Sequence, residues 1–449
     1  MAAGQGRRMH SALPKVLHPL AGRPLVAHVL AAVRALSPQA LALVVGHGGD
    51  AVAQALAAPD LTFVTQDPPR GTGDAVRVAL AALGGDGDTL VVNGDTPLIP
   101  AAALAAIVDV AAAGRLALLT ARVSAPGGLG RIVRDATGAV RAIVEDKDTT
   151  PEEARLHEIY SGVLAVPTAL LRAWIAALRN DNAQREFYLT DVVAIAVAAG
   201  VPVAAHVAAH QEDVQGVNDR AQLAAIERIV QRRQAAALLA AGTWIADPER
   251  FDLRGTLACG RDVRIDVGCV FEGDVALGDD VAVGAHCVLK NVTVGAGTTI
   301  APFSHLEAAT VGANCRIGPY ARLRPDTTLA DDVHIGNFVE VKASTLGRGA
   351  KANHLAYIGD AAVGSGVNYG AGSITANYDG VNKHRTVIGD GASIGSNCVL
   401  VAPVTVGAGA TIGAGSVIAR EAPPEVLTVS RAKQISVPGW KRPVKKSGR

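Results

Sequence analysis

The first residues of the chain combine two glycines with basic side chains. Gly4 and Gly6 stand ahead of Arg8 and Lys15. Glycines let backbone amides approach a phosphate closely, and the two cations can neutralise its charge. The segment is not a P-loop, because GxxxxGK[ST] is missing, and it is not a dinucleotide fingerprint, because Met9 replaces the third glycine. Alone, it predicts either a phosphate site or a tight turn.

Asp95 follows an apolar run at residues 89–92 and the pair Asn93-Gly94. Ligands of an open parallel sheet collect at the carboxyl ends of its strands, and carboxylate oxygens suit Mg²⁺. Chemistry that joins two phosphate-bearing substrates needs cations and alignment more than a nucleophile. Asp95 is therefore a candidate metal ligand, and the alternative is a residue that only closes a turn.

His354 is the second centre of possible chemistry. Within residues 351–359, the spacing predicts that Ala352, Ala356 and Ile358 point inward, so His354 should lie at a corner or outside. An exposed imidazole can accept a proton near neutral pH, and an amine must lose a proton when it attacks a thioester. A single exposed histidine is usually idle, so this interpretation depends on its surroundings.

The element that carries His354 is defined by a period of six residues. Large aliphatic residues recur at Ile388, Ile394, Leu400, Val406, Ile412 and Ile418, and small ones follow four positions later at Ala392, Cys398, Val404, Ala410 and Ser416. This period predicts three short strands per coil and coils stacked by parallel pairing, a left-handed parallel β-helix of hexapeptide repeats. The glycines that follow the aliphatics, such as Gly389 and Gly395, are expected to give the corners backbone freedom.

The same register extends upstream through residues 265–289 and 317–341. From residue 255 to 418, at about eighteen residues per coil, it predicts about nine coils and a prism about 45 Å long. Four of the five cysteines fall on its small inward positions and are predicted to be buried fillers rather than metal ligands or disulfides: Cys269, Cys287, Cys315 and Cys398. The register breaks between Thr375 and Ile388, and such interruptions commonly carry function.

The first 220 residues alternate apolar runs with alanine-rich helical patterns, which predicts an α/β domain with a Rossmann-like parallel sheet. Strands are expected at residues 41–45, 61–65, 89–92 and 116–123. Residues 221–241 contain no glycine or proline and predict a helical linker. The predicted domains are therefore 1–220, the linker at 221–241, and the prism with its tail at 242–449.

The composition argues against several classes of protein. The formal net charge is +1, which predicts no general attraction to nucleic acid or membranes. Residues 431–449 are an exception, because they contain seven basic residues and no acidic one, and they could attract a phosphate-bearing ligand. No signal peptide or membrane-spanning apolar run is evident, so a cytoplasmic location is expected.

Several motifs together resemble the sugar-1-phosphate nucleotidyltransferases. They are Ala2-Ala3-Gly4-x-Gly6-x-Arg8-Met9, Pro14-Lys15, Gln66, Gly71-Thr72-Gly73, Gly94-Asp95, Gly130-Arg131-Ile132, Glu145-x-Lys147 and Gly216-Val217-Asn218. With the prism, nearly the whole chain is similar to the bifunctional N-acetylglucosamine-1-phosphate uridylyltransferase and glucosamine-1-phosphate N-acetyltransferase family. The resemblance implies acetyl transfer from acetyl-CoA to glucosamine 1-phosphate, then uridylyl transfer from UTP with release of pyrophosphate. The product, UDP-N-acetylglucosamine, would feed bacterial cell-envelope polysaccharide synthesis.

The resemblance also implies residue roles in uridylyl transfer. Arg8 and Lys15 would be catalytic residues on the phosphates, and Asp95 and Asn218 would hold Mg²⁺. Gln66, Gly71 and Thr72 would lie near the uracil, while Gly130 and Glu145 would hold the sugar. The complete implied set for UTP and the UDP-sugar is Ala2, Ala3, Gly4, Lys15, Gln66, Gly71, Thr72, Asn93, Gly94, Asp95, Gly130, Glu145 and Asn218.

For acetyl transfer, the resemblance makes His354 the general base. It implies that Arg324, Lys342, Tyr357 and Asn368 bind the sugar phosphate, and that Ala371, Asn377, Tyr378, Ser396, Ala414 and Arg431 bind acetyl-CoA. A straight prism has no deep pocket of its own. Neighbouring prisms are therefore expected to complete each site, in a homotrimer as in the family.

The chain departs from the family pattern at three places. Met1 stands where the family usually has a leucine of its first strand, so we expect that strand to be missing here and hypothesise that translation starts further upstream. Tyr160 stands where an asparagine is expected to touch the sugar. Asn93 also replaces a tyrosine that is common before Gly94-Asp95, without an expected loss if the backbone makes that contact.

Two other functions stay open from the sequence. One is a nucleotidyltransferase with a single activity, whose prism serves only oligomerisation or regulation; Asn353-His354-Leu355 and Asn377-Tyr378 argue against it, because a scaffold needs neither. The other is a regulatory binding protein without catalysis, against which Asp95 and Lys15 argue. Both half-reactions, measured separately, discriminate between these alternatives and the bifunctional enzyme.

Overall fold

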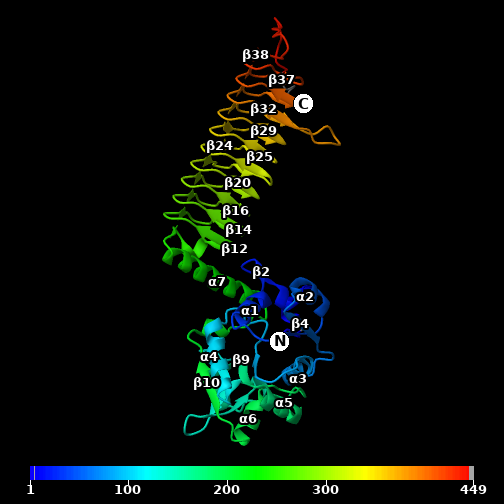
Figure 1. Cartoon of the computed structure of the whole chain (residues 1–449), viewed down its shortest axis with the longest axis vertical. Coiled ribbons are helices and arrows are strands. Elements are labelled where there is room, and N and C mark those ends of the chain that lie inside the picture. Colours follow the sequence, from blue (N-terminus) through cyan, green and yellow to red (C-terminus); the bar gives the residue numbers. More distant parts are fainter. Residues whose placement is uncertain (5, 444–449) are drawn as a thin grey trace, which may run out of the picture. The chain divides into compact units, whose positions relative to one another are not determined.

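The computed structural model describes residues 1–4 and 6–443. Figure 1 shows its elements along the chain, which divides into two compact units, Met1–Val230 and Gln231–Arg449. Helix α7, Arg220–Ala240, runs across this division and agrees within one residue with the helix expected at residues 221–241.

The first unit is an α/β fold around two main sheets, with a separate antiparallel pair of β1, Pro19–Leu20, and β2, Arg23–Pro24. The larger sheet has six strands in the order β10-β6-β9-β7-β8, with β5 paired to β9. These strands are β5 Asp88–Val91, β6 Leu116–Arg122, β7 Arg131–Arg134, β8 Val140–Val144, β9 Glu158–Pro167 and β10 Val203–Val207. The smaller sheet pairs β3, Leu41–Val45, with β4, Leu61–Thr65, in parallel. All four strands that the sequence predicts are therefore present, within one residue of the expected ends.

Strand β9 makes the larger sheet mixed rather than purely parallel. It runs antiparallel to β5, β6 and β7. Most of its residues are buried on both faces, so the side-chain pattern does not indicate the direction of the strand, which the connections decide. The helices of this unit are α1 Leu25–Arg34, α2 Gly49–Leu56, α3 Thr72–Ala82, α4 Ala101–Ala112, α5 Thr168–Ala177 and α6 Asp191–Ala198.

Met1 and Ala2 lie between the carboxyl ends of β3 and β5. Ala2 pairs in parallel with Val45, and the Met1 carbonyl accepts a hydrogen bond of 2.7 Å from the Gly94 amide. The Met1 amine donates to the Val92 carbonyl at 2.7 Å, and burial lowers the pKa of this amine to about 6. These two residues thus tie the start of the phosphate loop to the strand end that carries Asp95.

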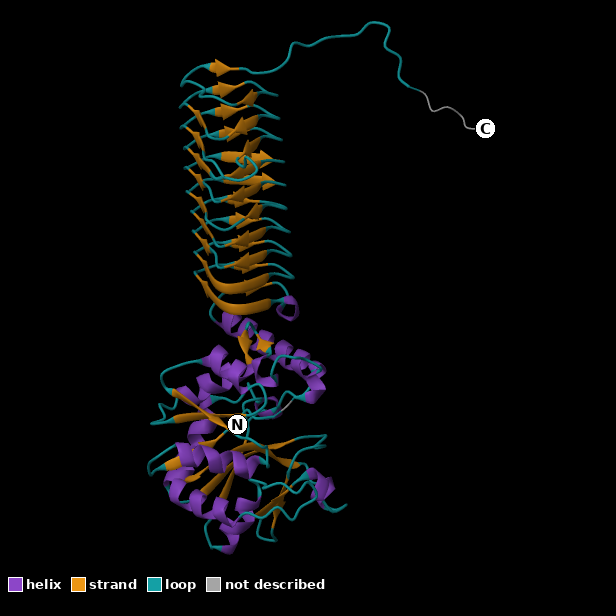
Figure 2. Cartoon of the chain, turned by 90° about the vertical axis from the view of Figure 1, so that its right-hand side faces the viewer, coloured by secondary structure: helices purple, strands orange, loops and turns teal. Residues whose placement is uncertain are grey.

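The second unit is a prism of stacked coils (Figure 2). One face has eleven parallel strands: β11 Trp244–Ile245, β13 Arg264–Ile265, β15 Ala282–Val283, β18 Thr299–Ile300, β21 Arg316–Ile317, β24 His334–Asn337, β27 Lys351–His354, β30 Asn368–Tyr369, β33 Ser393–Ile394, β36 Thr411–Ile412 and β38 Leu427–Thr428. The other two faces share seventeen strands, from β12, Asp252–Cys259, to β37, Val417–Ile418. The prism is therefore longer than the nine coils expected, because it begins before residue 255 and ends after residue 418.

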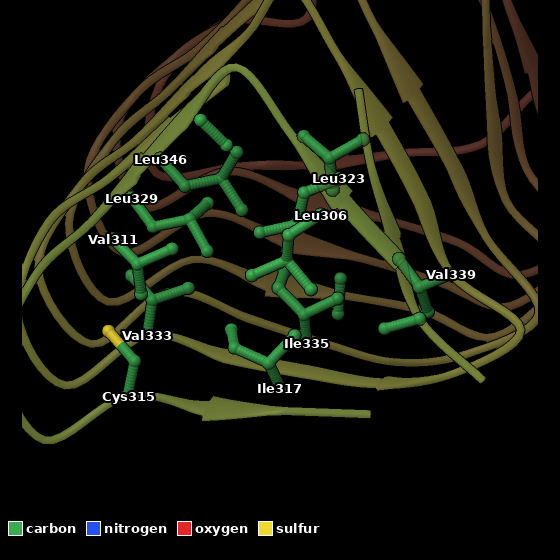
Figure 3. Close-up of a cluster of buried hydrophobic side chains, with 14 of the residues drawn as sticks. Leu306, Val311, Cys315, Ile317, Leu323, Leu329, Val333, Ile335, Val339 and Leu346 are labelled. Atoms are coloured by element: carbon green, nitrogen blue, oxygen red, sulfur yellow. The ribbon is translucent and has the colours of Figure 1, made fainter. Parts of the chain in front are cut away.

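The interior of the prism is filled by the residues of the six-residue period. Figure 3 shows some of them pointing inward, among them Leu306, Ile317, Leu323 and Ile335. These four side chains are at most 1% exposed. The four cysteines predicted as fillers are buried and carry free thiols, and desolvation raises the pKa of Cys269 to about 11 and that of Cys287 to about 12. They are therefore packing residues, as predicted.

The explanation given for the glycines after the aliphatics is wrong. Left-handed backbone occurs two residues later, for instance at Gly391, whereas Gly389 and Gly395 are not left-handed. A Cβ at either Gly389 or Gly395 would come within 2.5 Å of a backbone nitrogen of the next coil. These glycines are required because stacked coils approach closely, not because the corner needs positive φ.

The break in the register is a hairpin that leaves the column between β31, Ile374–Ala376, and β32, Thr386–Ile388. The His384 amide donates to the Asn377 carbonyl at 2.8 Å, and Tyr378 pairs antiparallel with Lys383. None of the helices in residues 1–4 and 6–443 has the length and apolar character that a membrane span requires.

Candidate active sites

Three of the predicted site residues of the first unit meet at Lys15. Its ammonium lies 2.5 Å from Asp95 Oδ2 and 3.1 Å from Asn218 Oδ1. The side chains of Lys15 and Asp95 are only 11% and 22% exposed. The Val217 amide donates to the Asp95 carbonyl at 2.9 Å, which brings Asn218 from a distant part of the chain to this strand end.

The backbone ahead of Lys15 approaches its side chain closely at one glycine. Gly6 has a φ of +58°, and a Cβ there would lie 2.7 Å from the Lys15 Cβ. Glycine is thus required at this position both by the backbone and by the close approach. Arg8 lies exposed on the short turn Arg7–Met9.

The Lys15 cluster suits a divalent cation. The oxygens of Asp95 and Asn218 both face the position of the Lys15 ammonium, so they already hold a positive charge between them. Mg²⁺ usually takes one or two protein oxygens and completes its shell with water and phosphate. No group of three or more His, Cys, Asp or Glu side chains in the described residues is placed to hold a metal ion, so the remaining ligands here would come from substrate and water.

Gln66 and Thr72 are positioned by their own hydrogen bonds. The buried Gln66 amide donates to the Gly71 carbonyl and to Asp74 Oδ2, both at 3.0 Å. The Leu189 amide donates to Thr72 Oγ1 at 3.0 Å. These hydrogen bonds fix both residues at the start of α3.

Glu145 and Gly130 lie close together beyond the central sheet. A Cβ at Gly130 would be 3.7 Å from Glu145 Oε2, and the Thr190 hydroxyl donates to Glu145 Oε1 at 3.0 Å. Burial raises the pKa of Glu145, and nearby carboxylates add to the effect. A cavity of about 300 Å³ adjoins it, lined also by Tyr188 and Asp191.

Tyr160 is adjacent to this pair through the Gly130 carbonyl, which accepts a bond of 2.8 Å from the Tyr160 amide. Its side chain is 8% exposed and packs into the core with Ile132 and Ile143. Its hydroxyl is buried without a hydrogen-bond partner, and burial raises its pKa. Asn93 lies over Gly162, where a Cβ would meet the Asn93 amide nitrogen.

His354 is exposed at the end of β27, on the outside of the prism as predicted. Its carbonyl accepts a bond from Gly372 of the next coil at 3.4 Å, and Leu355 turns the corner with a φ of 49°. Tyr357 begins β28, Tyr357–Gly359, on the adjoining face. A Cβ at Gly359 would lie 2.3 Å from the Tyr357 hydroxyl, so this glycine is required for the tyrosine ring to lie along the face.

The predicted cations occupy the same face as Tyr357. Arg324 lies 2.9 Å from Glu340, and Lys342 lies 3.3 Å from Asp360. Asn377 donates to the same Asp360 oxygen and lies 3.5 Å from the Tyr357 hydroxyl. The hairpin that interrupts the six-residue register therefore contacts the face that carries the two cations.

Lys383 is a further cation at this place, and the sequence analysis did not single it out. It lies on the hairpin, and contact with Lys342 lowers its pKa. Two neighbouring ammonium groups, of which only that of Lys342 is paired with Asp360, form an arrangement that an added anion would complete. The one feature of the sequence that could have indicated Lys383 is its position as a basic residue within the break of the six-residue period.

The residues implied for acetyl-CoA follow the edge that His354 occupies. Ala371, Ser396 and Ala414 each precede the corner residue of a successive coil, and backbone hydrogen bonds link these corners. Asn368 is exposed on β30, and Arg431 donates to the Ala414 carbonyl at 3.0 Å. Tyr378 is exposed on the hairpin between β31 and β32. Of the basic tail, residues 444–449 lie outside the described residues.

The fold and the sites define a class of protein: a nucleotidyltransferase unit followed by a hexapeptide-repeat transferase unit. The MobA-like NTP transferase domain matches residues 1–241. The GMPPB C-terminal domain matches residues 253–347, and the bacterial transferase hexapeptide (six repeats) matches residues 385–420.

Full-length relatives specify the family. The chain is 59% identical to the bifunctional protein GlmU of Methylibium petroleiphilum and 57% identical to that of Ralstonia nicotianae, each over 99% of this chain and 98% of the relative. It is 54% identical to that of Acidovorax sp. strain JS42, over 100% and 98%. The chain belongs to the GlmU family of bifunctional transferases. This confirms the resemblance to the bifunctional uridylyltransferase and N-acetyltransferase that the sequence predicted.

Proposed function

We propose that the chain makes UDP-N-acetylglucosamine in two reactions, one in each unit. The prism transfers the acetyl group of acetyl-CoA to glucosamine 1-phosphate. The first unit then joins N-acetylglucosamine 1-phosphate to the uridylyl group of UTP and releases pyrophosphate. The reactions belong in the cytoplasm, and the product supplies peptidoglycan and lipopolysaccharide synthesis.

The observation that carries this proposal is the exposed His354 beside a face that gathers Arg324, Lys342 and Tyr357. A prism that only spaced or assembled subunits would need neither an exposed base nor paired cations at a break in its register. His354 takes a proton from the amine as the amine attacks the thioester carbonyl, and the CoA thiolate leaves. Arg324 and Lys342 hold the phosphate, while Tyr357 and Asn368 orient the sugar.

In the first unit, Lys15 supports uridylyl transfer by neutralising phosphate charge. A phosphate oxygen of the sugar substrate attacks the α-phosphorus of UTP, and pyrophosphate leaves. Arg8 and Lys15 reduce the repulsion between the two anions, and Gly4 lets the loop amides approach the triphosphate. Asp95 and Asn218 would hold Mg²⁺, which would supply positive charge to neutralise the phosphates.

The remaining contacts place the two substrates. Gln66, Gly71 and Thr72 contact the uracil, and Gly130 and Glu145 bind sugar hydroxyls. Acetyl-CoA lies along the edge that carries Ala371, Ser396 and Ala414, and Asn377, Tyr378 and Arg431 complete its contacts. Three prisms side by side form a homotrimer in which a neighbouring copy closes each acetyl-transfer site.

Both half-reactions, measured separately on three proteins, test this proposal. We expect His354→Ala to abolish CoA release from acetyl-CoA and glucosamine 1-phosphate while pyrophosphate release is unchanged. We expect Asp95→Ala to show the reverse. If both activities fall together in either variant, the two sites are not independent and the assignment of one reaction to each unit is wrong.

A further inference from the structure

The hairpin between β31 and β32, the orange loop that projects from the column in Figure 1, is held together by the carboxylate of Asp379. Oδ1 of Asp379 accepts hydrogen bonds from the backbone amides of Val381 and Asn382 at 2.8 and 2.6 Å. Oδ2 lies 2.7 Å from Nε2 of His384. We call this contact between Asp379 and His384 the clasp. One oxygen therefore closes the tip of the hairpin, and the other holds its returning arm.

Lys383 lies between these two points of attachment. The amide of Asn382, just before it, and the ring of His384, just after it, both bind the carboxylate of Asp379. The backbone of Lys383 also pairs antiparallel with Tyr378. Because both of its neighbours are held, Lys383 leaves the hairpin in a restricted direction. The clasp thus helps to fix where the Lys383 ammonium is presented.

The Lys383 ammonium needs a restraint because it lies beside that of Lys342. The contact between the two lysines lowers the pKa of Lys383. Lys342 is already paired with Asp360 at 3.3 Å. Repulsion between the two ammonium groups favours conformations in which Lys383 points into solvent. A phosphate site that uses both cations therefore needs a structure that keeps Lys383 in place.

Packing against the prism contributes little to this restraint. A cavity of about 290 Å³ separates part of the hairpin from the prism, and its lining includes Lys383, His384 and Arg385 of the hairpin and Asp326, Thr345 and Asp360 of the prism. The tip of the hairpin is open to solvent, since Val381 is 83% exposed and Tyr378 is 62% exposed. The position of the returning arm therefore depends on hydrogen bonds within the hairpin, among them the clasp.

The strength of the clasp depends on pH. The Asn382 amide, the His384 ring and the Val381 amide hold the pKa of Asp379 well below its usual range, so this carboxylate stays ionised near neutral pH. Histidine side chains commonly change charge between pH 5 and 8. The clasp is therefore an ion pair when His384 is protonated and a weaker hydrogen bond when it is neutral. The other charged groups around the cavity beside His384 are two cations and two carboxylates: Lys383, Arg385, Asp326 and Asp360.

We propose that Asp379 and His384 are positioning residues for acetyl transfer, because the clasp holds Lys383 beside Lys342 and so strengthens binding of the sugar phosphate. The effect is largest at pH values where His384 is protonated. This inference rests on the proposed binding of glucosamine 1-phosphate by acetyl-transfer residues that include Lys342. The side chains of His384 and Asp379 are 34% and 44% exposed, so the ion pair is weak, and its loss should raise KM by about two- to fivefold.

Asp379→Asn is the decisive variant, because its Oδ1 can still close the tip while the charge of the clasp is lost. KM for glucosamine 1-phosphate is measured by CoA release at pH 6 and pH 8, and each variant is compared with wild type at the same pH. We expect Asp379→Asn and His384→Gln to raise KM about two- to fivefold at pH 6 and much less at pH 8. The kcat, the circular dichroism and pyrophosphate release should not change.

The sign of the change separates the clasp from simple electrostatics. Removal of a negative charge near a phosphate site would by itself lower KM. A KM for Asp379→Asn at or below that of wild type at pH 6 would therefore overturn the inference. Arg348→Gln is the matched control, because Arg348 forms a surface ion pair with Asp331 at 3.1 Å elsewhere on the prism. Its KM should equal that of wild type at both pH values.

Two further measurements show whether the clasp acts through Lys383 and whether it depends on turnover. In a Lys383→Met background, Asp379→Asn should cause no further rise in KM, and an equal rise in both backgrounds would contradict the inference. Calorimetric titration of glucosamine 1-phosphate into the CoA-bound protein gives a Kd without reaction, and the Kd should change as KM does. If wild type and variants show these Kd differences but wild type releases no CoA, the clasp stands and the proposed acetyl transfer fails. If wild type does not bind glucosamine 1-phosphate, or all Kd values are equal, the clasp is excluded.

Discussion

Lys342→Met should weaken the binding of glucosamine 1-phosphate without unfolding the prism. Lys342 lies 3.3 Å from Asp360 and is 17% exposed, next to the Lys383 ammonium. A hydrogen bond between charged groups contributes about 1.5–3 kcal/mol, which corresponds to about 10–150-fold in KM. The ion pair with Asp360 is near the surface and contributes at most about 1 kcal/mol to folding. Binding should therefore change far more than stability.

The assay is CoA release at varied glucosamine 1-phosphate and saturating acetyl-CoA. We expect a raised KM for the sugar phosphate, little change in kcat, and a midpoint of urea unfolding close to that of wild type. Lys290→Met is the matched control, because Lys290 forms a similar pair with Glu307 at 3.0 Å in a lower coil. Lys383→Met should resemble Lys342→Met. A KM within twofold of wild type for Lys342→Met would refute the phosphate-binding role.

Three further predictions follow from other parts of the structure. Tyr160→Phe removes a buried hydroxyl that has no hydrogen-bond partner, so it should raise the free energy of unfolding, measured in urea, by about 1 kcal/mol. A fall in the free energy of unfolding by the same amount would show that the hydroxyl does have a partner. Glu145 has a raised pKa, so in wild type its contribution to stability is largest below its usual pKa of about 4.3 and falls as pH rises through the raised value. Glu145→Gln should abolish this fall in stability with pH. The Tm of the variant should therefore exceed that of wild type at pH 7 but not at pH 4. Its KM for N-acetylglucosamine 1-phosphate should rise. Removal of Mg²⁺ with EDTA should stop pyrophosphate release and leave CoA release unchanged; equal loss of both would contradict separate sites.

The prism could be predicted from the sequence because one rule repeats. Each inward position, such as Ile317 or Ile335, is set by the same parallel pairing to the coil below, so the period alone gives fold, core and exposure. Outward placement of His354 followed from the inward neighbours Ala352 and Ala356. The first unit offered no such repeat. Strand β9 is apolar on both faces, so its antiparallel direction depends on tertiary connections that local sequence does not carry.

The contacts of the hairpin between β31 and β32 could not be predicted from the sequence either. The hairpin was visible as a break, but nothing in its composition states that Asn377 reaches Asp360 or that Lys383 approaches Lys342. Likewise, the φ of a corner residue is set by its place in the coil. The positive φ occurs at Gly391 and not at Gly389, where the sequence pattern had suggested it.

The spacing of the acetyl-transfer site follows from backbone pairing rather than from side-chain packing. Arg324 and Lys342 occupy equivalent positions on consecutive coils, since the Arg324 amide donates to the Val341 carbonyl, and Lys342 pairs in register with Gly359. Two cations one coil apart, about 4.8 Å, can bracket a single phosphate. The third position must be glycine, because the Tyr357 hydroxyl lies where its Cβ would be. The column thus presents two cations on consecutive coils and, on the next coil, the hydroxyl of Tyr357, so a phosphate bracketed by the cations would lie beside this hydroxyl.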